Sequence, residues 1–380
     1  MCRRLVLLSI PNVWFPNNGN LYHCVHCWRV LFMIVVCPAM MLVSSCERSS
    51  PTQPHVDTSS HNFSWQMYRL GDGISNFFTD IALVHDSLAF AVGSGFLNDS
   101  TGRLDPIVYN SARWDGHDWK FQRVPYEYQG QLLYRAIGWV FALSDTDVWF
   151  ENSVHWDGHT YRDVDIGTSI FYGIGSNKMW GDSTGRLYVV GNKGTIAYSP
   201  DHGQSWQQLP SGTTLDIRDV FGNANPTTGS TEILAVAGNP YLSSDHAILK
   251  ISGTSVSALN SNAIDQALTG TWLESNDAYW VVGGGMYEKH SLGDSSWAQV
   301  PTTVTPKFTE AVRGNAWNDI VIVGDFGVVL HYDGSTWMNY STVTGFSVGV
   351  YYSVAMKGNL IMAVGANPPN AIALIGRRTR

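Results

Sequence analysis

The chain has 380 residues, of which 44% are hydrophobic and only 14% are charged, and it contains 37 glycines and 15 tryptophans. Its formal net charge of −8 argues against a nucleic-acid partner, because a phosphate backbone requires a basic surface. No segment carries a sustained apolar stripe at helical spacing, so a helical protein is excluded and an all-β protein is expected.

The first 46 residues have the layout of a signal peptide. Arg29 precedes the apolar run 30–43, which is too short for a spanning helix of about 20 residues and is followed by small residues. The last of the five cysteines, Cys46, ends the sequence VSSC, which resembles a bacterial lipobox. The resemblance implies a lipid on Cys46 and a place in the bacterial cell envelope. An ordinary signal peptide with an incidental cysteine is the alternative.

Residues 47–62 are polar, rich in serine and proline, and lack apolar periodicity, so they are predicted to form a flexible tether. By family resemblance, Glu47 in place of an aspartate after the cysteine favours the outer membrane over the inner one. Residues 47–380 hold 20 of the 23 basic residues and all 31 acidic ones, a formal charge of −11.

From residue 63 onward the chain repeats one pattern, an apolar strand that ends in glycine. The pattern ends at Gly93, Gly191, Gly238, Gly283, Gly324 and Gly365, and a seventh copy near Glu151 lacks the glycine. From the second of these glycines the intervals are 47, 45, 41 and 41 residues. Periods in the forties with about four strands per unit are typical of propeller blades. The sequence therefore predicts a seven-bladed β-propeller over residues 63–380.

A second repeated feature is a turn that precedes the last strand of a unit, with Asp and Gly followed by an aromatic residue. The copies lie at 114–119, 156–161, 199–206, 291–297 and 332–337. Asp accepts turn amide hydrogen bonds, Gly takes a positive φ, and the aromatic ring packs back on the blade. The copy at 199–206 resembles the Asp-box of sialidase-type propellers, which is structural in that family. The chain is also similar in repeat style to photosystem assembly-factor propellers.

The two ends of the chain are predicted to share the last blade. The final unit stops after a strand at 371–375 and lacks an outer strand, whereas residues 63–70 supply one. Trp65 stands where Trp119, Trp206, Trp297 and Trp337 begin their strands. Because a closed ring hides its sheet edges, we expect the N-terminal strand to pair with the last blade.

The innermost strands are predicted near 77–84, 137–142, 177–181, 217–222, 268–273, 309–314 and 351–357. Phe141, Trp180, Phe221, Trp272 and Arg313 share one position and are expected to pack between blades. On or near these strands lie the candidate ligand-binding residues Asp80, Arg135, Arg218, Glu310 and Arg313. Arginine suits bidentate recognition of carboxylates. The alternative is that these residues form ion pairs along a central channel.

No nucleophile elbow, Walker loop, dinucleotide fingerprint or HExxH motif is present. Cys24-x-x-Cys27 has no second ligand pair, and the twelve histidines show no ligand spacing, so neither a metal nor another cofactor is predicted. The expected function is a non-enzymatic, lipid-anchored binding or scaffolding module for a protein or glycan. The alternatives are a sialidase-like glycan hydrolase, using two of Asp80, Asp219 and Glu310, and a structural envelope protein.

Overall fold

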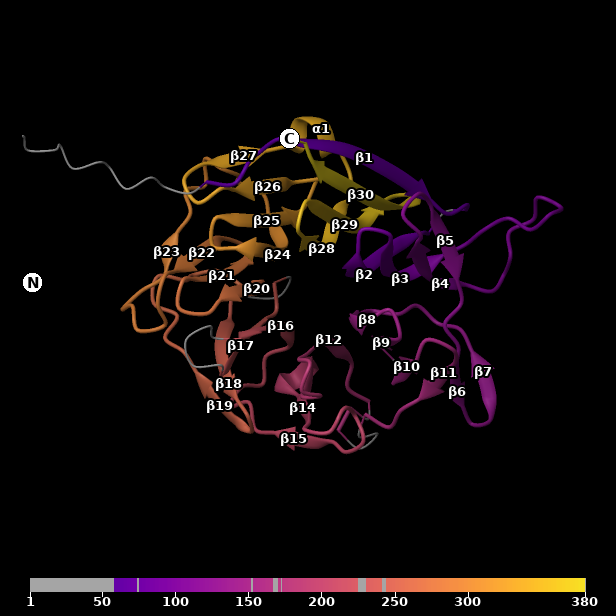
Figure 1. Ribbon diagram of the computed structural model, residues 1–380, viewed down its shortest axis with the longest axis horizontal. Coiled ribbons are helices and arrows are strands. Elements are labelled where there is room, and N and C mark those ends of the chain that lie inside the picture. The colour runs from indigo at the N-terminus through magenta and orange to yellow at the C-terminus, as the bar shows by residue number, and fades with distance from the viewer. Residues whose placement is uncertain are drawn as a thin grey trace, which may run out of the picture. The chain divides into compact units, whose positions relative to one another are not determined.

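The computed structural model describes residues 58–379 apart from 74, 152, 167–169, 172, 225–229 and 241–243. The predicted signal peptide, Cys46 and most of the predicted tether lie outside the described residues, so the lipid anchor stays a prediction. Seven four-stranded antiparallel sheets form the blades of a ring (Figure 1), which confirms the predicted seven-bladed β-propeller. Within the described chain, no helix is long and apolar enough to cross a membrane.

Each blade runs from an inner strand beside the ring axis to an outer strand at the rim (Figure 1). The inner strands are β2 (Phe77–His85), β8 (Val140–Ser144), β12 (Ser176–Gly181), β16 (Ile217–Ala224), β20 (Leu268–Glu274), β24 (Thr309–Ala316) and β28 (Val350–Lys357). The second strands are β3 (Leu88–Gly95), β9 (Asp147–Phe150), β13 (Leu187–Gly191), β17 (Thr231–Gly238), β21 (Ala278–Gly283), β25 (Asp319–Gly324) and β29 (Leu360–Asn367).

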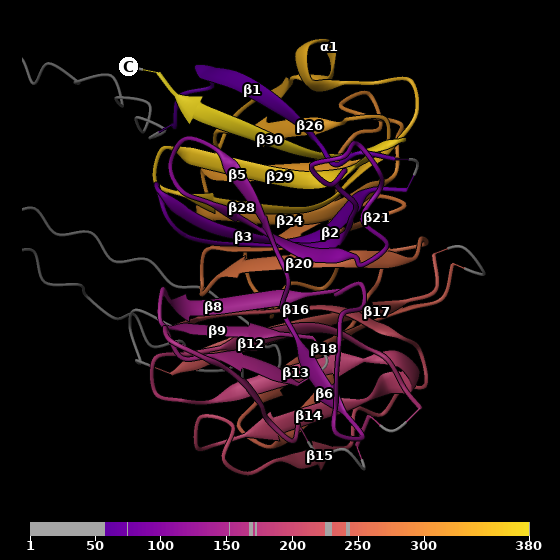
Figure 2. The same ribbon diagram turned by 90° about the vertical axis from the view of Figure 1, so that its right-hand side faces the viewer.

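The third strands are β4 (Tyr109–Trp114), β10 (Val154–Trp156), β14 (Ile196–Ser199), β18 (His246–Ser252), β22 (Met286–Lys289), β26 (Val329–Tyr332) and β30 (Asn370–Arg378). The outer strands are β5 (Trp119–Gln122), β11 (Tyr161–Asp163), β15 (Gln207–Leu209), β19 (Ser255–Ala258), β23 (Ala298–Gln299), β27 (Trp337–Asn339) and β1 (Phe63–Leu70). The remaining elements are a hairpin of β6 (Tyr126–Tyr128) and β7 (Gln131–Leu133), the 3₁₀ turn η1 (Asn192–Gly194) and the helix α1 (Ser341–Thr344). Seen from the side, the strands run along the ring axis, so the connections gather at its two ends (Figure 2).

The ring closes as predicted, because the N-terminal strand completes the seventh blade. β1 pairs with β30 over its full length, from Phe63 opposite Arg378 to Leu70 opposite Ala371. The Trp65 ring covers Gly376 on β30, where an added Cβ would lie only 2.4 Å from the ring. The pairing protects an edge of blade seven that would otherwise present unpaired backbone groups.

The glycine that ends the second strand is required by a close backbone approach to the inner strand. An added Cβ at Gly365 would lie 1.9 Å from the carbonyl oxygen of Val350, at the start of β28. At Gly324 it would lie 2.2 Å from the carbonyl oxygen of Phe308, just before β24. Since only hydrogen fits in these gaps, the repeated glycine in the sequence records a contact that five of the seven blades share.

Blade two departs from this arrangement, and the strand predicted for it was placed wrongly. The inner strand was predicted at 137–142 but spans Val140–Ser144, because both backbone groups of Ile137 bond to blade one instead. Glu151 stands where other blades have the strand-ending glycine, and the glycine occurs on the facing segment as Gly138. The Gly138 N–H donates to the Glu151 carboxylate, while burial raises the pKa of that carboxyl group.

The Asp-Gly turns have the local role that their sequence predicted. Asp333 accepts hydrogen bonds from the backbone N–H groups of Ser335 at 2.8 Å and Thr336 at 2.6 Å. Gly334 takes a φ of +90°, which favours glycine. The Trp337 ring, which opens the outer strand, lies 4.9 Å from the Tyr332 ring, so the aromatic residue packs back on the blade.

The last residues of the predicted tether lie against blade six. The Ser59 hydroxyl donates to the Asn318 carbonyl at 2.6 Å. The His61 Nε2 atom lies 3.1 Å from the Asp333 carboxylate, and its Nδ1 atom lies 2.7 Å from the His331 Nδ1 atom. This part of the predicted tether is therefore bound to the propeller rather than free.

We expect Gly365→Ala to lower the free energy of unfolding by about 1–3 kcal/mol, because its methyl group would overlap the Val350 carbonyl. The matched control is Gly293→Ala, because the nearest neighbour of its added Cβ is the Ser291 hydroxyl at 3.5 Å. The control should change stability by less than about 0.5 kcal/mol. Urea unfolding measures both variants, and equal stabilities would contradict the steric explanation.

Candidate functional site

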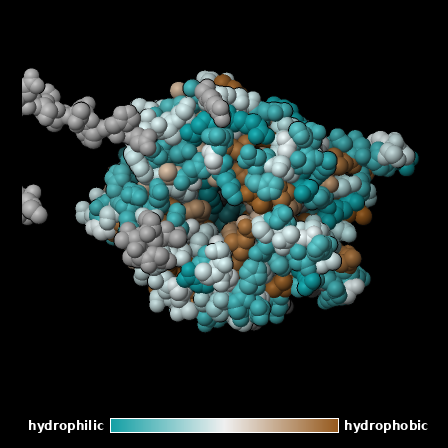
Figure 3. All heavy atoms as spheres, viewed as in Figure 1, coloured by the Kyte–Doolittle hydropathy of each residue, from teal (hydrophilic) through white to brown (hydrophobic). Residues whose placement is uncertain are grey.

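Six of the seven inner strands carry a β-bulge at their second or third residue. The extra residues of these bulges, together with Gly138 of blade two, line a central cavity of about 90 Å³. We call them the bulge ring: Thr79, Gly138, Asn177, Arg218, Thr269, Glu310 and Tyr352. The space-filling view shows a hollow at the middle of the propeller (Figure 3). The bulges thus place one residue from each blade around a single cavity, at what we call the bulge end.

Asp80, the residue after the bulge in blade one, joins four blades. Its carboxylate accepts the backbone N–H of Val140 at 3.0 Å and the hydroxyl of Ser353 at 2.7 Å. It also forms an ion pair with the Lys178 Nζ atom at 2.5 Å. Only 3% of the Asp80 side chain is exposed, so this charge depends on these partners for its stability.

Asp219 plays the same part on the other side of the cavity. Two guanidinium nitrogens of Arg313 lie 2.9 and 3.1 Å from its two carboxylate oxygens, a bidentate ion pair. The same carboxylate accepts the backbone N–H of Thr271 at 3.0 Å, which links blades four, five and six. Burial by itself would lower the pKa of Arg313, but the charge and hydrogen bonds of Asp219, together with the charge of Asp80, outweigh burial and raise it.

Three members of the bulge ring form hydrogen bonds between neighbouring blades. Each donates a side-chain hydrogen bond to a backbone carbonyl of the next blade, and the donors are Thr79 (3.0 Å), Asn177 (2.9 Å) and Thr269 (3.0 Å). The Arg218 guanidinium is turned toward its own blade, with Asp216 at 3.2 Å and the Gly238 carbonyl at 3.1 Å. The cavity is therefore a polar, cross-linked centre in which most side chains have structural partners.

Four of the five predicted candidate residues line this cavity: Asp80, Arg218, Glu310 and Arg313. Arg135 does not, because blade two begins its inner strand later and Gly138 takes its place in the ring. The exposed Arg135 guanidinium lies 5.5 Å from the Tyr126 ring instead. Ligand binding by these residues stays a prediction, and the predicted alternative of ion pairs along a channel describes how Asp80 and Arg313 are arranged.

Sequence reasoning did not select Lys178 or Ser353, although both belong to the same network. Each follows the bulge of its strand directly, in the position that Asp80 and Asp219 occupy in blades one and four. An alignment of the inner strands at the bulge would have shown this shared position. The bulge itself is a backbone feature that the residue pattern does not reveal.

Three of the five large side chains predicted to pack between blades do so against glycines of the next inner strand. An added Cβ would lie 3.3 Å from the Phe141 ring at Gly181, 2.6 Å from the Trp180 ring at Gly222 and 3.1 Å from the Trp272 ring at Gly314. These rings therefore fill the seams between blades. They do not form a stacking platform in the channel.

A larger groove of about 800 Å³ lies at the seam of blades one and two. Its lining includes the Arg113 guanidinium and the aromatic rings of Phe90, Trp156 and Tyr161. Burial raises the pKa of the Tyr161 hydroxyl, while the charge of Arg113 acts in the opposite direction. Because Thr146, in a turn at the other end of the blades, also lines the groove, it is separate from the bulge ring.

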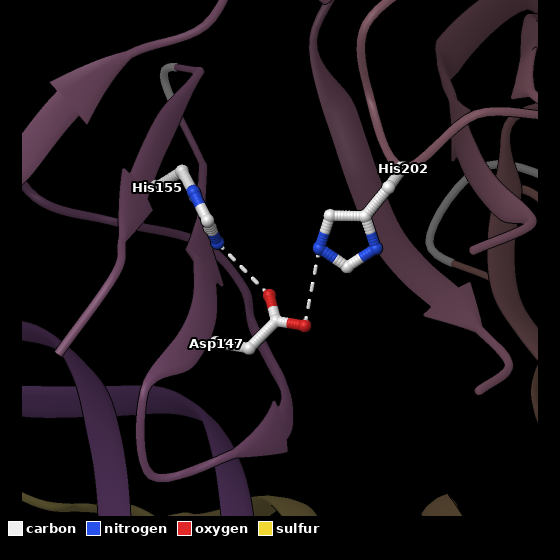
Figure 4. A group of neighbouring side chains, drawn as sticks. All are labelled: Asp147, His155 and His202. Atoms are coloured by element: carbon white, nitrogen blue, oxygen red, sulfur yellow. Dashed lines mark hydrogen bonds and ion pairs between the residues drawn. The ribbon is translucent and has the colours of Figure 1, made fainter. Parts of the chain in front are cut away.

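One group of potential metal ligands lies at the seam of blades two and three. It consists of Asp147, His155 and His202, whose ligating atoms all lie within 4.8 Å of one another (Figure 4). The spacing of the histidines in the sequence did not indicate this group, because His202 comes from a different blade. Its chemistry is separate from that of the central cavity.

The strands, their closure and the polar central cavity define the class of a seven-bladed β-propeller. No family model and no curated protein matches the sequence. Among solved structures, the chain is similar to "YCF48 bound to D1 peptide", with 15% identity and a TM-score of 0.62 over 86% of this chain and 100% of that one. It is also similar to YCF48 from Cyanidioschyzon merolae, with 12% identity and a TM-score of 0.57 over 82% of this chain and 98% of that one. At these identities the likeness shows the fold alone.

We expect Arg313→Leu to lower the free energy of unfolding by about 3–5 kcal/mol, because it leaves the buried Asp219 carboxylate without its cation. Adding Asp219→Asn should recover part of this loss, since asparagine keeps an oxygen for the Thr271 N–H but carries no charge. Arg135→Leu, at an exposed position, should change stability by less than about 0.5 kcal/mol. Chemical denaturation of the single and double variants closes a double-mutant cycle, and strictly additive losses would contradict the coupling.

Proposed function

We propose that this chain is a non-enzymatic, lipid-anchored β-propeller that binds a protein partner at its bulge end. The distribution of exposed large hydrophobic side chains carries the proposal. The described chain has eight such side chains. Seven of them belong to the bulge ring or to connections at the bulge end, namely Leu104, Ile107, Leu132, Phe326, Val343, Val348 and Tyr352. The eighth, Met338, lies on the outer strand β27. Apolar side chains gathered at one end of a soluble domain are typical of a protein-contact surface.

Phe326, Val348 and Tyr352, from blades six and seven, form what we call the mouth surface. The Phe326 N–H donates to the carbonyl of Gly349, next to Val348, at 2.9 Å. The Lys307 Nζ atom lies 4.5 Å from the Phe326 ring centre. Burial, together with nearby carboxylates, raises the pKa of the Tyr352 hydroxyl, which stays protonated and able to donate. Apolar contact area beside a few polar groups suits a peptide segment.

A polypeptide is the ligand class that this surface favours. An aliphatic side chain such as Val348 gains free energy when apolar atoms cover it, and a polypeptide supplies such atoms more readily than a glycan does. The similar structure "YCF48 bound to D1 peptide" holds a peptide on a propeller of the same fold. This analogy supports the proposal at the level of the fold.

The central cavity favours binding over sialidase-like hydrolysis. Asp80 and Asp219, two of the three carboxylates considered for hydrolysis, are each held in an ion pair. Both oxygens of each carboxylate already accept hydrogen bonds from the protein, so neither group is placed to exchange a proton with a substrate. We also assign the turn at 199–206 to the Asp-box type. Its Asp201 carboxylate accepts the backbone N–H of Ser205 at 2.8 Å, which supports a structural role.

The proposed membrane attachment rests on the sequence around Cys46. A lipid on this cysteine would place the propeller outside a bacterial membrane, with the outer membrane favoured over the inner one. Because Ser59 and His61 bind blade six, the free part of the tether would end before them.

We expect a Val348→Glu/Tyr352→Ser double variant to lose partners that the wild-type protein captures from envelope extracts, because both changes remove apolar contact area at the mouth surface. Met338→Glu is the matched control, since Met338 is 42% exposed but lies on an outer strand. Quantitative mass spectrometry of the captured proteins compares the three baits. Identical capture by all three, or capture of glycans alone, would contradict the proposed protein-binding surface.

The lipid anchor predicts that Cys46→Ser abolishes incorporation of labelled palmitate when the full chain is expressed in a bacterial host. The variant should also move from the membrane fraction to the soluble fraction. Cys37→Ser, within the apolar run, should behave like the wild-type protein. Retention of the label in the Cys46→Ser protein would contradict lipidation at this position.

A further inference from the structure

Asp147, His155 and His202 converge from two blades onto one point. Asp147 is the first residue of β9, His155 lies in β10, and His202 lies in the turn between β14 and β15. The Asp147 Oδ1 atom is 2.9 Å from His155 Nε2, and its Oδ2 atom is 3.2 Å from His202 Nε2. Figure 4 shows the two imidazole rings facing the carboxylate from either side.

The surrounding residues hold this group in place. The Trp149 indole N–H donates to Asp147 Oδ1 at 2.9 Å, and its ring stacks on the His155 ring at 4.2 Å. Gly203, next to His202, packs on the same indole so closely that an added Cβ would lie 2.4 Å from it. The His202 backbone N–H donates to the Gly185 carbonyl at 2.8 Å, so its turn is fixed to blade three.

Blade six contains the same arrangement with a different third member. Asp319 is the first residue of β25, and His331 in β26 lies 2.7 Å from it, as His155 does from Asp147. In both blades the histidine pairs with the residue two positions after the aspartate. The third member comes from the following blade: His202 lies in the turn after its third strand, and in blade six Arg378 ends the third strand of blade seven.

The group in blade six is a structural ion pair, whereas the group in blade two has the ligands of a potential metal site. In blade six, the Arg378 guanidinium supplies the cation, and the His331 side chain is fully buried. Arginine has no lone pair to give to a metal, whereas a neutral imidazole does. In blade two, His202 takes the place of the arginine, and 42% of its side chain is exposed, so solvent reaches the group.

We propose that Asp147, His155 and His202 bind a divalent transition-metal ion, with Zn²⁺ as the reference ion. Two imidazoles and one carboxylate are a common ligand set for zinc, which then keeps a fourth position open. Ligands about 2.0–2.1 Å from a tetrahedral zinc ion lie about 3.3 Å apart, close to the observed nitrogen–oxygen separations of 2.9 and 3.2 Å. The bound ion would link blade two to blade three at their seam, just as Arg378 links blade six to blade seven.

The proposal is tested by titrating the full chain with ZnCl₂ in a calorimeter and comparing it with His202→Arg, which copies the blade-six arrangement. The wild-type protein should bind one more equivalent of zinc than His202→Arg. His159→Arg, the same change at an exposed histidine outside the group, should bind as the wild type does. Cys24 and Cys27 are present in every protein, so any zinc bound there cancels in the comparison.

Thermal unfolding gives an independent readout that does not depend on stoichiometry. Zinc should raise the unfolding temperature of the wild-type and His159→Arg proteins by several degrees and leave His202→Arg unshifted. Asp147→Asn, which keeps the size of the side chain but weakens the ligand, serves if His202→Arg does not fold. Equal zinc stoichiometry and equal thermal shifts in the wild type and the folded variant would overturn the proposal.

Discussion

The close contact between the end of the second strand and the start of the inner strand is the constraint on which the rest of this propeller depends. Only a glycine lets the two backbones approach as they do at Gly365 and Val350, whereas in blade two the Gly138 N–H donates to the Glu151 side chain. At this contact the inner strands bulge and turn one extra residue toward the axis. The bulge residues that line the central cavity thus lie beside a packing contact that five of the seven blades share.

Two buried aspartates then link separate blades through ion pairs. Asp80 and Asp219 each cap a backbone N–H of the next blade and hold a cation from the blade beyond it. Because these groups are buried, each charge is favourable only while its partners stay in place, which makes the relative position of the blades specific. The apolar seams, filled by rings such as Trp180 packing on glycine, add cohesion with less directional preference.

The two ends of the ring differ in chemistry. The bulge end carries the mouth surface and nearly all of the exposed large hydrophobic side chains of the described chain. The other end carries tight Asp-Gly turns and the aspartate–histidine groups that join neighbouring blades. A partner-binding role at one end and a bracing role at the other are consistent with this division. The solvent-accessible group around His202 lies within this bracing region.

The sequence by itself determined the fold, the number of blades and the closure by residues 63–70, because strands, turns and strand-ending glycines are local features that repeat at a steady period. Of the five candidate residues that it selected, four line the central cavity, since they lie on or near the inner strands. Only the tertiary structure decided that Arg135 lies elsewhere, because the start of one strand shifted by three residues. It alone brought His202 to Asp147 and His155, since a contact across a blade seam depends on how the blades pack and leaves no periodic trace in the chain.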